Sequence, residues 1–171
     1  MRENPRRLLV MRHAKAEAVA ATDHARRLTT RGRRDAAEAG RWAAAHDFRP
    51  DHVFVSSAAR ADETWSSFRE AAGLDVTAEL DPGLYAAGPD TALAVLRSAP
   101  PDAATVMIVG HNPTMAQLVH LLDDGTADVD AFAELSTGLA TSAVAVLEVS
   151  RAWAGLDVAT ARIAAVHVGR A

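Results

Sequence analysis

Short apolar runs, several rich in β-branched residues, alternate along the chain with longer segments whose apolar positions recur at helical spacing. The apolar runs predict strands at residues 8–11, 52–56, 105–109, 143–149 and 158–168, and a short extended piece at 76–79. The longer segments predict helices at residues 30–46, 58–72, 90–98 and 113–122. This alternation predicts an α/β fold: a three-layer sandwich with a mostly parallel central sheet and helices on both faces.

The length of 171 residues predicts a single domain spanning residues 1–171, because domains commonly contain about 100–200 residues. The chain shows no internal repeat, no low-complexity region and no linker long enough to separate two domains. The last two predicted strands, 143–149 and 158–168, are expected to form a hairpin joined by an irregular segment.

The composition excludes several classes of function. The formal charge is -4 and no lysine-rich tract stands out, so nonspecific nucleic-acid binding has no electrostatic support. The absence of cysteine excludes disulfides, thiol nucleophiles and Cys-ligated zinc. The apolar run at residues 8–11 is too short for a signal-peptide core, and no stretch approaches the roughly 20 apolar residues of a membrane span. We therefore expect a cytoplasmic protein with no membrane partner.

Neither a metal nor an organic cofactor is expected. No pair of histidines has metal-ligand spacing together with a nearby carboxylate. The chain also lacks a glycine-rich phosphate loop of the Walker or dinucleotide-binding kind.

Three predicted strands end in side chains that favour anions. The first strand ends in Arg12-His13, the second is followed by Arg60, and the strand at 105–109 is followed by His111. Ligands of open α/β sheets bind beyond the carboxyl ends of the strands, so these groups are expected to meet at one edge. Two arginines and two histidines at one edge predict an anion site, and a phosphoryl group is the obvious occupant.

These residue types suit phosphoryl transfer. Arginine stays charged and offers a planar pair of donors, which neutralises the charge on the transferring group. A neutral imidazole nitrogen can attack phosphorus and divide hydrolysis into two steps. The second histidine would donate a hydrogen bond to the same group, and amides of the helix that starts near Pro113 would add to the field.

Each residue alone has a simpler interpretation. Arg60 could be a helix-surface arginine paired with Glu63 or Glu70, and His111 could cap a helix or stabilise a turn. Their joint placement at successive strand ends favours the functional interpretation.

The motif residues resemble those of the histidine phosphatase superfamily, which is also called phosphoglycerate mutase-like. The matching segments are Arg12-His13-Ala14, with alanine where the family has glycine; Leu28-Thr29-x-x-Gly32; Ser56-x-x-x-Arg60-Ala61-x-x-Thr64; and Gly110-His111. Within the superfamily, the small size, the Arg-His-Ala variant and the segments Arg26-Arg27-Leu28-Thr29, Leu84-Tyr85-Ala86 and Gly110-His111-Asn112-Pro113 resemble the short branch of SixA-type phosphohistidine phosphatases.

The resemblance implies a role for each matching residue. His13 would be the phospho-accepting nucleophile, and Arg12, Arg60 and His111 would form the phosphate pocket. Arg26 is a candidate fifth phosphate contact, with a solvated loop arginine as the alternative.

One position departs from larger relatives, which carry a proton-donating carboxylate near the segment matched by Leu84-Tyr85-Ala86. Glu79, Asp81 and Asp90 lie nearby in sequence, but the sequence places none of them in the site. A phosphohistidine has a P–N bond and an imidazole leaving group, which departs more readily than an alkoxide and depends less on an acid.

The sequence therefore favours a metal-independent phosphatase that acts through phosphorylated His13 on a phosphohistidine-bearing protein. A small-molecule phosphomonoesterase of the same superfamily and a non-catalytic phosphate-binding module remain as alternatives. A mutase is disfavoured, because the chain has little spare length for segments that would shield a phosphoenzyme from water.

Overall fold

A six-stranded sheet forms the centre of the protein. The computed structural model describes residues 5–171. The strands are β1 (Arg6–Arg12), β2 (His52–Ser56), β3 (Glu79–Asp81), β4 (Thr105–Gly110), β5 (Ala143–Val149) and β6 (Ala161–Val168). Their order in the sheet is β3-β2-β4-β1-β5-β6; the pairs among β3, β2, β4 and β1 are parallel, and β5 is antiparallel to both its neighbours.

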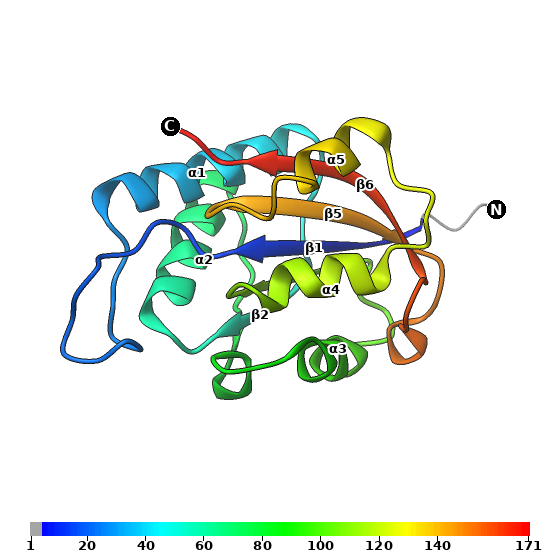
Figure 1. Ribbon diagram of the computed structural model, residues 1–171, viewed down its shortest axis with the longest axis horizontal. Helices are drawn as coiled ribbons and strands as arrows, with labels where there is room; N and C mark the ends of the chain where they lie inside the picture. The colour runs from blue at the N-terminus through cyan, green and yellow to red at the C-terminus, as the bar shows by residue number, and fades with distance from the viewer. Residues whose placement is uncertain (1–4) are drawn as a thin grey trace.

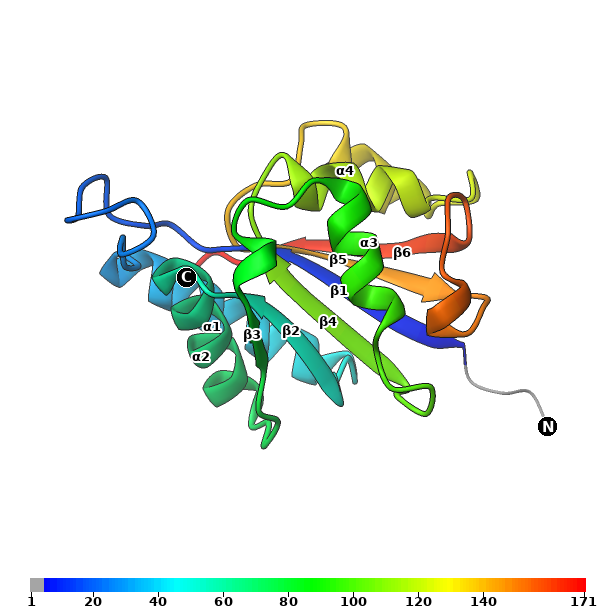
Figure 2. The same ribbon diagram turned by 90° about the horizontal axis from the view of Figure 1, so that it is seen from below.

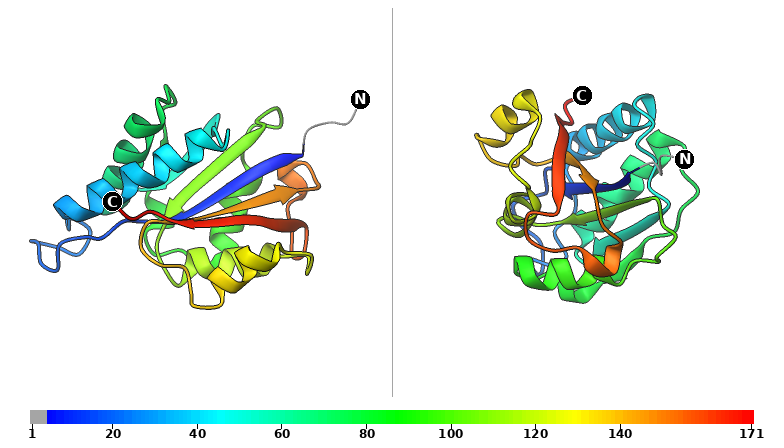
Figure 3. Two further views of the ribbon diagram at one scale, coloured as in Figure 1. Left: turned by 90° about the horizontal axis from the view of Figure 1, so that it is seen from above. Right: turned by 90° about the vertical axis from the view of Figure 1, so that its right-hand side faces the viewer.

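Within residues 5–171, five helices cover the two faces of this sheet. They are α1 (Thr30–Ala45), α2 (Ala59–Ala72), α3 (Pro89–Arg97), α4 (Thr114–Leu122) and α5 (Val129–Leu135), and two single 3₁₀ turns span Pro82–Leu84 and Trp153–Gly155. Helices α1 and α2 lie on one face, and α3, α4 and α5 lie on the other (Figures 1 and 2). The view from above in Figure 3 shows the same three layers. The predicted α/β sandwich with a mostly parallel sheet and a final hairpin is confirmed.

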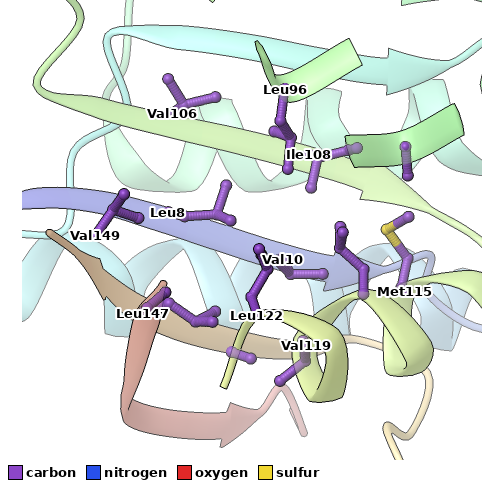
Figure 4. Packing of buried hydrophobic residues seen from close by; sticks show 14 of the residues in the cluster. Leu8, Val10, Leu96, Val106, Ile108, Met115, Val119, Leu122, Leu147 and Val149 are labelled. Carbon is purple, nitrogen blue, oxygen red and sulfur yellow. The ribbon is translucent and has the colours of Figure 1, made fainter. Parts of the chain in front are cut away.

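The two central strands are apolar on both sides, which explains their continuous hydrophobic runs. Leu8 and Val10 of β1 point to the face covered by α3, α4 and α5, where they pack with Ile108 and Leu122 (Figure 4). The alternate residues Leu9 and Met11 point to the face covered by α1 and α2. Helices therefore fix both faces of β1, and the residue that follows it has a defined position.

Three details differ from the predicted elements. The predicted piece at 76–79 is instead β3 at Glu79–Asp81, because only these residues come into register with the carboxyl end of β2. The last strand starts at Ala161 and not at 158, because Ala159 adopts a φ of 55°, which interrupts an extended chain. Helix α5 was not predicted; Asp128 caps it by accepting hydrogen bonds from the amides of Asp130 and Ala131.

No helix within residues 5–171 combines the length and apolar character needed to cross a membrane.

Candidate active site

The carboxyl ends of β1 and β4 bring two histidines together. Arg12 pairs with Gly110 in the parallel ladder, and the amide of His13 donates to the carbonyl of Gly110 at 2.9 Å. His111 follows directly, so its ring lies beside that of His13 with 5.2 Å between the ring centroids. The sheet register thus brings together two residues that are far apart in sequence.

His13 is held in a defined tautomer. Its Nδ1 lies 2.7 Å from the carbonyl oxygen of Ala14, which can only accept, so Nδ1 carries the proton. Nε2 therefore has a free lone pair. Burial, together with the positive charges of Arg60 and Arg12, lowers the pKa of His13 to about 4, against the opposing effect of the bond to Ala14. At neutral pH the imidazole is uncharged, the form that can act as a nucleophile.

A buried threonine links this strand end to α2. The amide of Ala14 donates to Thr64 Oγ1 at 3.0 Å, and the Thr64 hydroxyl donates to the carbonyl of Arg60 at 2.6 Å. On the other side, Gly32 of α1 approaches the carbonyl of Lys15 so closely that a Cβ would lie 2.1 Å from that oxygen. These contacts fix the turn after His13 between two helices.

Ser56, at the end of β2, orients His111. Its Oγ lies 2.7 Å from His111 Nε2 and also accepts the amide of Ala58 at 3.3 Å. The serine hydroxyl can donate to Nε2, and in that tautomer the proton of His111 lies on Nδ1. That Nδ1 is buried and has no hydrogen-bond partner within residues 5–171. Burial, together with the nearby His13 and Arg60, lowers the pKa of His111 to about 4.

Two arginines complete this group: Arg12 is half-buried and Arg60 is buried. Arg12 donates to the carbonyl of Leu139 at 3.2 Å. The Arg60 side chain is only 7% exposed and donates twice to Asp23: Nη1 to the backbone oxygen at 2.9 Å, and Nη2 to Oδ2 at 3.2 Å. In both arginines Nε is buried and lacks a hydrogen-bond partner in the described part of the chain. Donors of this kind fit an anion with several oxygens.

Arg60 is therefore not the helix-surface arginine of the simpler interpretation. Its partner is Asp23, and the structure pairs Glu63 with Arg27 and Arg33 instead. Glu63 also accepts the amide of Leu28 and so attaches the loop before α1 to α2.

A second group of polar side chains surrounds the first. We call Arg12, His13, Arg60 and His111 the floor of the site, and Asp23, His24, Arg26 and Tyr85 its rim. The loop between β1 and α1, which projects beyond the tip of β1 in Figure 1, supplies three of the four rim residues.

Asp23 is the centre of the rim, and sequence reasoning missed it. Its carboxylate accepts hydrogen bonds from Arg26 Nε at 3.0 Å and from the Tyr85 hydroxyl at 2.5 Å, besides the bond from Arg60. The Tyr85 bond, with the charges of Arg60 and Arg26, lowers the pKa of Asp23 to about 2. Asp23 lies in an alanine-rich loop without helical or strand periodicity, and its only sequence signal is the arginine three residues later.

The other sequence candidates have separate positions. Arg26 is at the rim, tied to Asp23 and to the carbonyl of Glu17. Glu79 pairs with His52, and Asp81 caps the following 3₁₀ turn, so the structure gives both a partner outside the site. Within residues 5–171, no cluster of three or more His, Asp or Glu side chains is arranged to hold a metal ion.

Several known proteins are similar to this chain in sequence and fold. Residues 8–85 match the profile of the histidine phosphatase superfamily, branch 1. The chain is 35% identical to a proposed phosphohistidine phosphatase SixA from Nakamurella multipartitia, with 99% of each chain covered and a TM-score of 0.88. It is 29% identical to a proposed SixA from Agrobacterium tumefaciens, covering 95% of this chain and 97% of that one, with a TM-score of 0.79. An uncharacterized protein from Mycobacterium leprae is 33% identical over 165 residues, which is 94% of this chain and 100% of the relative.

Proposed function

The chain belongs to the histidine phosphatase superfamily, in its short SixA-type branch, and from this premise we propose that it hydrolyses phosphohistidine on a protein through a phosphoenzyme on His13. That it is a phosphatase, a hydrolase, follows from the family; the nucleophile, the pocket and the substrate are the proposal. The observation that carries it is the neutral His13 ring, with its free Nε2, lying 5.2 Å from His111.

In the first step, Nε2 of His13 attacks phosphorus and forms a P–N bond. The bond from phosphorus to the substrate imidazole breaks, and its electron pair returns to the substrate nitrogen. A substrate ring that is protonated on its other nitrogen leaves as neutral imidazole. Arg12 and Arg60 balance the charge on the equatorial oxygens, and the Nδ1 proton of His111 donates to one of them.

In the second step, water attacks the phosphorus of phosphorylated His13. The P–N bond to the enzyme breaks, inorganic phosphate leaves, and Nε2 recovers its lone pair. The sum consumes one phosphohistidine and one water and yields histidine and phosphate. The bond from Nδ1 to the Ala14 carbonyl keeps the same nitrogen available for each turnover.

The carboxylate at the rim supports a substrate with a good leaving group. A phosphate ester needs a proton on its departing oxygen, and Asp23, with a pKa of about 2, is ionised at neutral pH and has none to give.

Two alternative functions predict different activities. A small-molecule phosphomonoesterase would cleave alkyl phosphates faster than phosphohistidine. A non-catalytic module would bind phosphate through Arg12 and Arg60 without turning over any substrate.

The His13→Ala variant tests the nucleophile. With wild type, we expect a phosphorylated phosphotransfer protein to release phosphate and to leave an acid-labile phosphate on the enzyme. His13→Ala should lower kcat/KM by roughly 10⁴-fold or more and abolish the labelling. His120→Ala, an exposed position on α4, is the control and should match wild type. Turnover of His13→Ala within a few-fold of wild type would exclude the nucleophile, and faster hydrolysis of an alkyl phosphate by wild type would exclude the substrate.

A further inference from the structure

Four rings form a row that leads out of the site. The His13 and His111 centroids are 5.2 Å apart, those of His111 and Tyr85 are 5.8 Å apart, and those of Tyr85 and His24 are 4.9 Å apart. The last two pairs meet edge to face, at 84° and 77°. The first three rings are partly buried and His24 is exposed, so the row runs from the floor toward solvent.

The Tyr85 ring is held in place from several sides. Its hydroxyl donates to Asp23 at 2.5 Å, and the Arg60 guanidinium carbon lies 5.9 Å from the ring centroid. The preceding residue, Leu84, is buried in the core beneath α3. A ring fixed in this way is ready to pack against a ligand, because little conformational freedom remains to be lost on binding.

The His24 ring is fixed as well, although it belongs to an exposed loop. Its Nε2 lies 3.0 Å from Ser57 Oγ, and its backbone oxygen accepts the amide of Ala59 at 3.0 Å. Ser57 lies between β2 and α2, and Ala59 is the first residue of α2, directly before Arg60. His24 thus has a defined position beside Tyr85.

The in-line geometry of phosphoryl transfer determines which part of the substrate lies near these rings. The leaving group must depart on the side of phosphorus opposite His13, and His13 lies at the buried end of the row. A phosphoryl group held by Arg12, Arg60 and His111 would then direct its leaving group away from His13, toward the more exposed side on which Tyr85 and His24 lie.

We propose that Tyr85 and His24 form a wall that receives an aromatic leaving group, a planar ring such as imidazole. Tyr85 is then a specificity-determining residue, because its ring face packs against substrates whose phosphoryl group is attached to a ring. The inference rests on the proposed function for the position of the phosphoryl group, and extends it to the identity of the group that leaves. Aromatic pairs with this spacing favour each other beyond their buried area.

The test compares substrates with and without a ring in three variants. The substrates are a phosphohistidine peptide, p-nitrophenyl phosphate and acetyl phosphate, which is labile but carries no ring. Tyr85→Leu should lower kcat/KM by about three- to tenfold on the two ring-bearing substrates and by less than about twofold on acetyl phosphate. His24→Ala should show the same pattern with a smaller loss.

Tyr85→Phe is the matched control. It keeps the ring and loses the bond to Asp23, so any loss should be equal on all three substrates and the preference for rings should remain. If Tyr85→Leu lost the same activity on all three substrates, with an unchanged thermal unfolding midpoint, the proposed wall would be contradicted.

The experiment distinguishes a failure of the proposed wall from a failure of the proposed function. If wild type did not cleave the phosphohistidine peptide, and Tyr85→Leu still lost more activity on p-nitrophenyl phosphate than on acetyl phosphate, the proposed substrate would be wrong and the wall supported.

Discussion

The floor and the rim of the site are built by different means. His13 and His111 of the floor sit at the ends of paired strands, where the ladder between β1 and β4 sets their positions and helices cover both faces. The rim depends on side-chain bonds that converge on one carboxylate, Asp23, whose side chain is 56% exposed. Packing thus fixes the groups expected to do chemistry, and a small polar network fixes the groups around them. We expect changes in the floor to abolish turnover, and changes in the rim to adjust it.

Two arginine variants with the same chemical change give the sharpest contrast. Arg60→Lys keeps the charge and loses the planar pair of donors at a buried position, so we expect kcat/KM to fall by about 10²- to 10³-fold. Arg26→Lys makes the same change at the rim, where the expected loss is less than about fivefold. Steady-state kinetics on acetyl phosphate measures both.

The comparison needs a check of folding, because Arg60 is buried. Thermal unfolding of both lysine variants should stay cooperative, and Arg60→Lys should still bind inorganic phosphate, although more weakly. Similar losses in the two variants would mean that the floor and the rim are one unit and that the distinction is wrong.

The floor histidines should also make the stability of the folded protein depend on pH. The pKa values of His13 and His111 are both lowered to about 4, mainly by burial, so the pair stays neutral in the folded protein until the pH falls to that range. The unfolded chain takes up these protons near pH 6.5. It therefore binds more protons than the folded chain between about pH 6.5 and 4, and the free energy of unfolding should fall as the pH is lowered through this window.

The loss from the pair should be on the order of several kcal/mol, which urea unfolding at several pH values can measure. His13→Gln removes one of the two groups and should flatten the dependence, whereas His120→Gln should leave it unchanged. NMR titration should show both floor histidines protonating near pH 4 in the wild type. A His13 that titrates near 6.5 would contradict the buried, neutral nucleophile.

Sequence reasoning could predict the floor because strand ends are visible in sequence. Arg12 and His13 follow an apolar run, as does His111, and parallel strands bring their carboxyl ends to one edge. The structure does bring these residues together with Arg60. Their catalytic roles, like the single domain, stay predictions.

The rim could not be predicted in the same way. The loop that carries Asp23 has no hydrophobic period, and its partners Arg60 and Tyr85 lie 37 and 62 residues away. Helix α5 escaped prediction for a similar reason: its seven residues form only about two turns and give little periodic signal, and its Asp128 cap is evident only in the structure. The short strand β3 is set by its register with β2, which no local pattern encodes.

The smallest expected effect tests whether the rim influences phosphate binding and turnover at the floor. Asp23→Asn keeps the shape of the side chain and can still accept the Tyr85 hydroxyl, but it removes the negative charge beside Arg60 and Arg26. Two consequences follow from that single loss. The pocket becomes more positive, so inorganic phosphate should inhibit at a concentration about two- to fivefold lower, and Arg60 loses an oriented partner, so kcat should fall by about threefold. The tighter phosphate binding should weaken as salt is added, because it is electrostatic. Asp124→Asn is the matched control: this exposed aspartate bonds to Thr126, away from the site, and its variant should leave both constants unchanged. If Asp23→Asn behaved like the control, the carboxylate would only anchor its own loop, and the floor would set the affinity for phosphate without help from the rim.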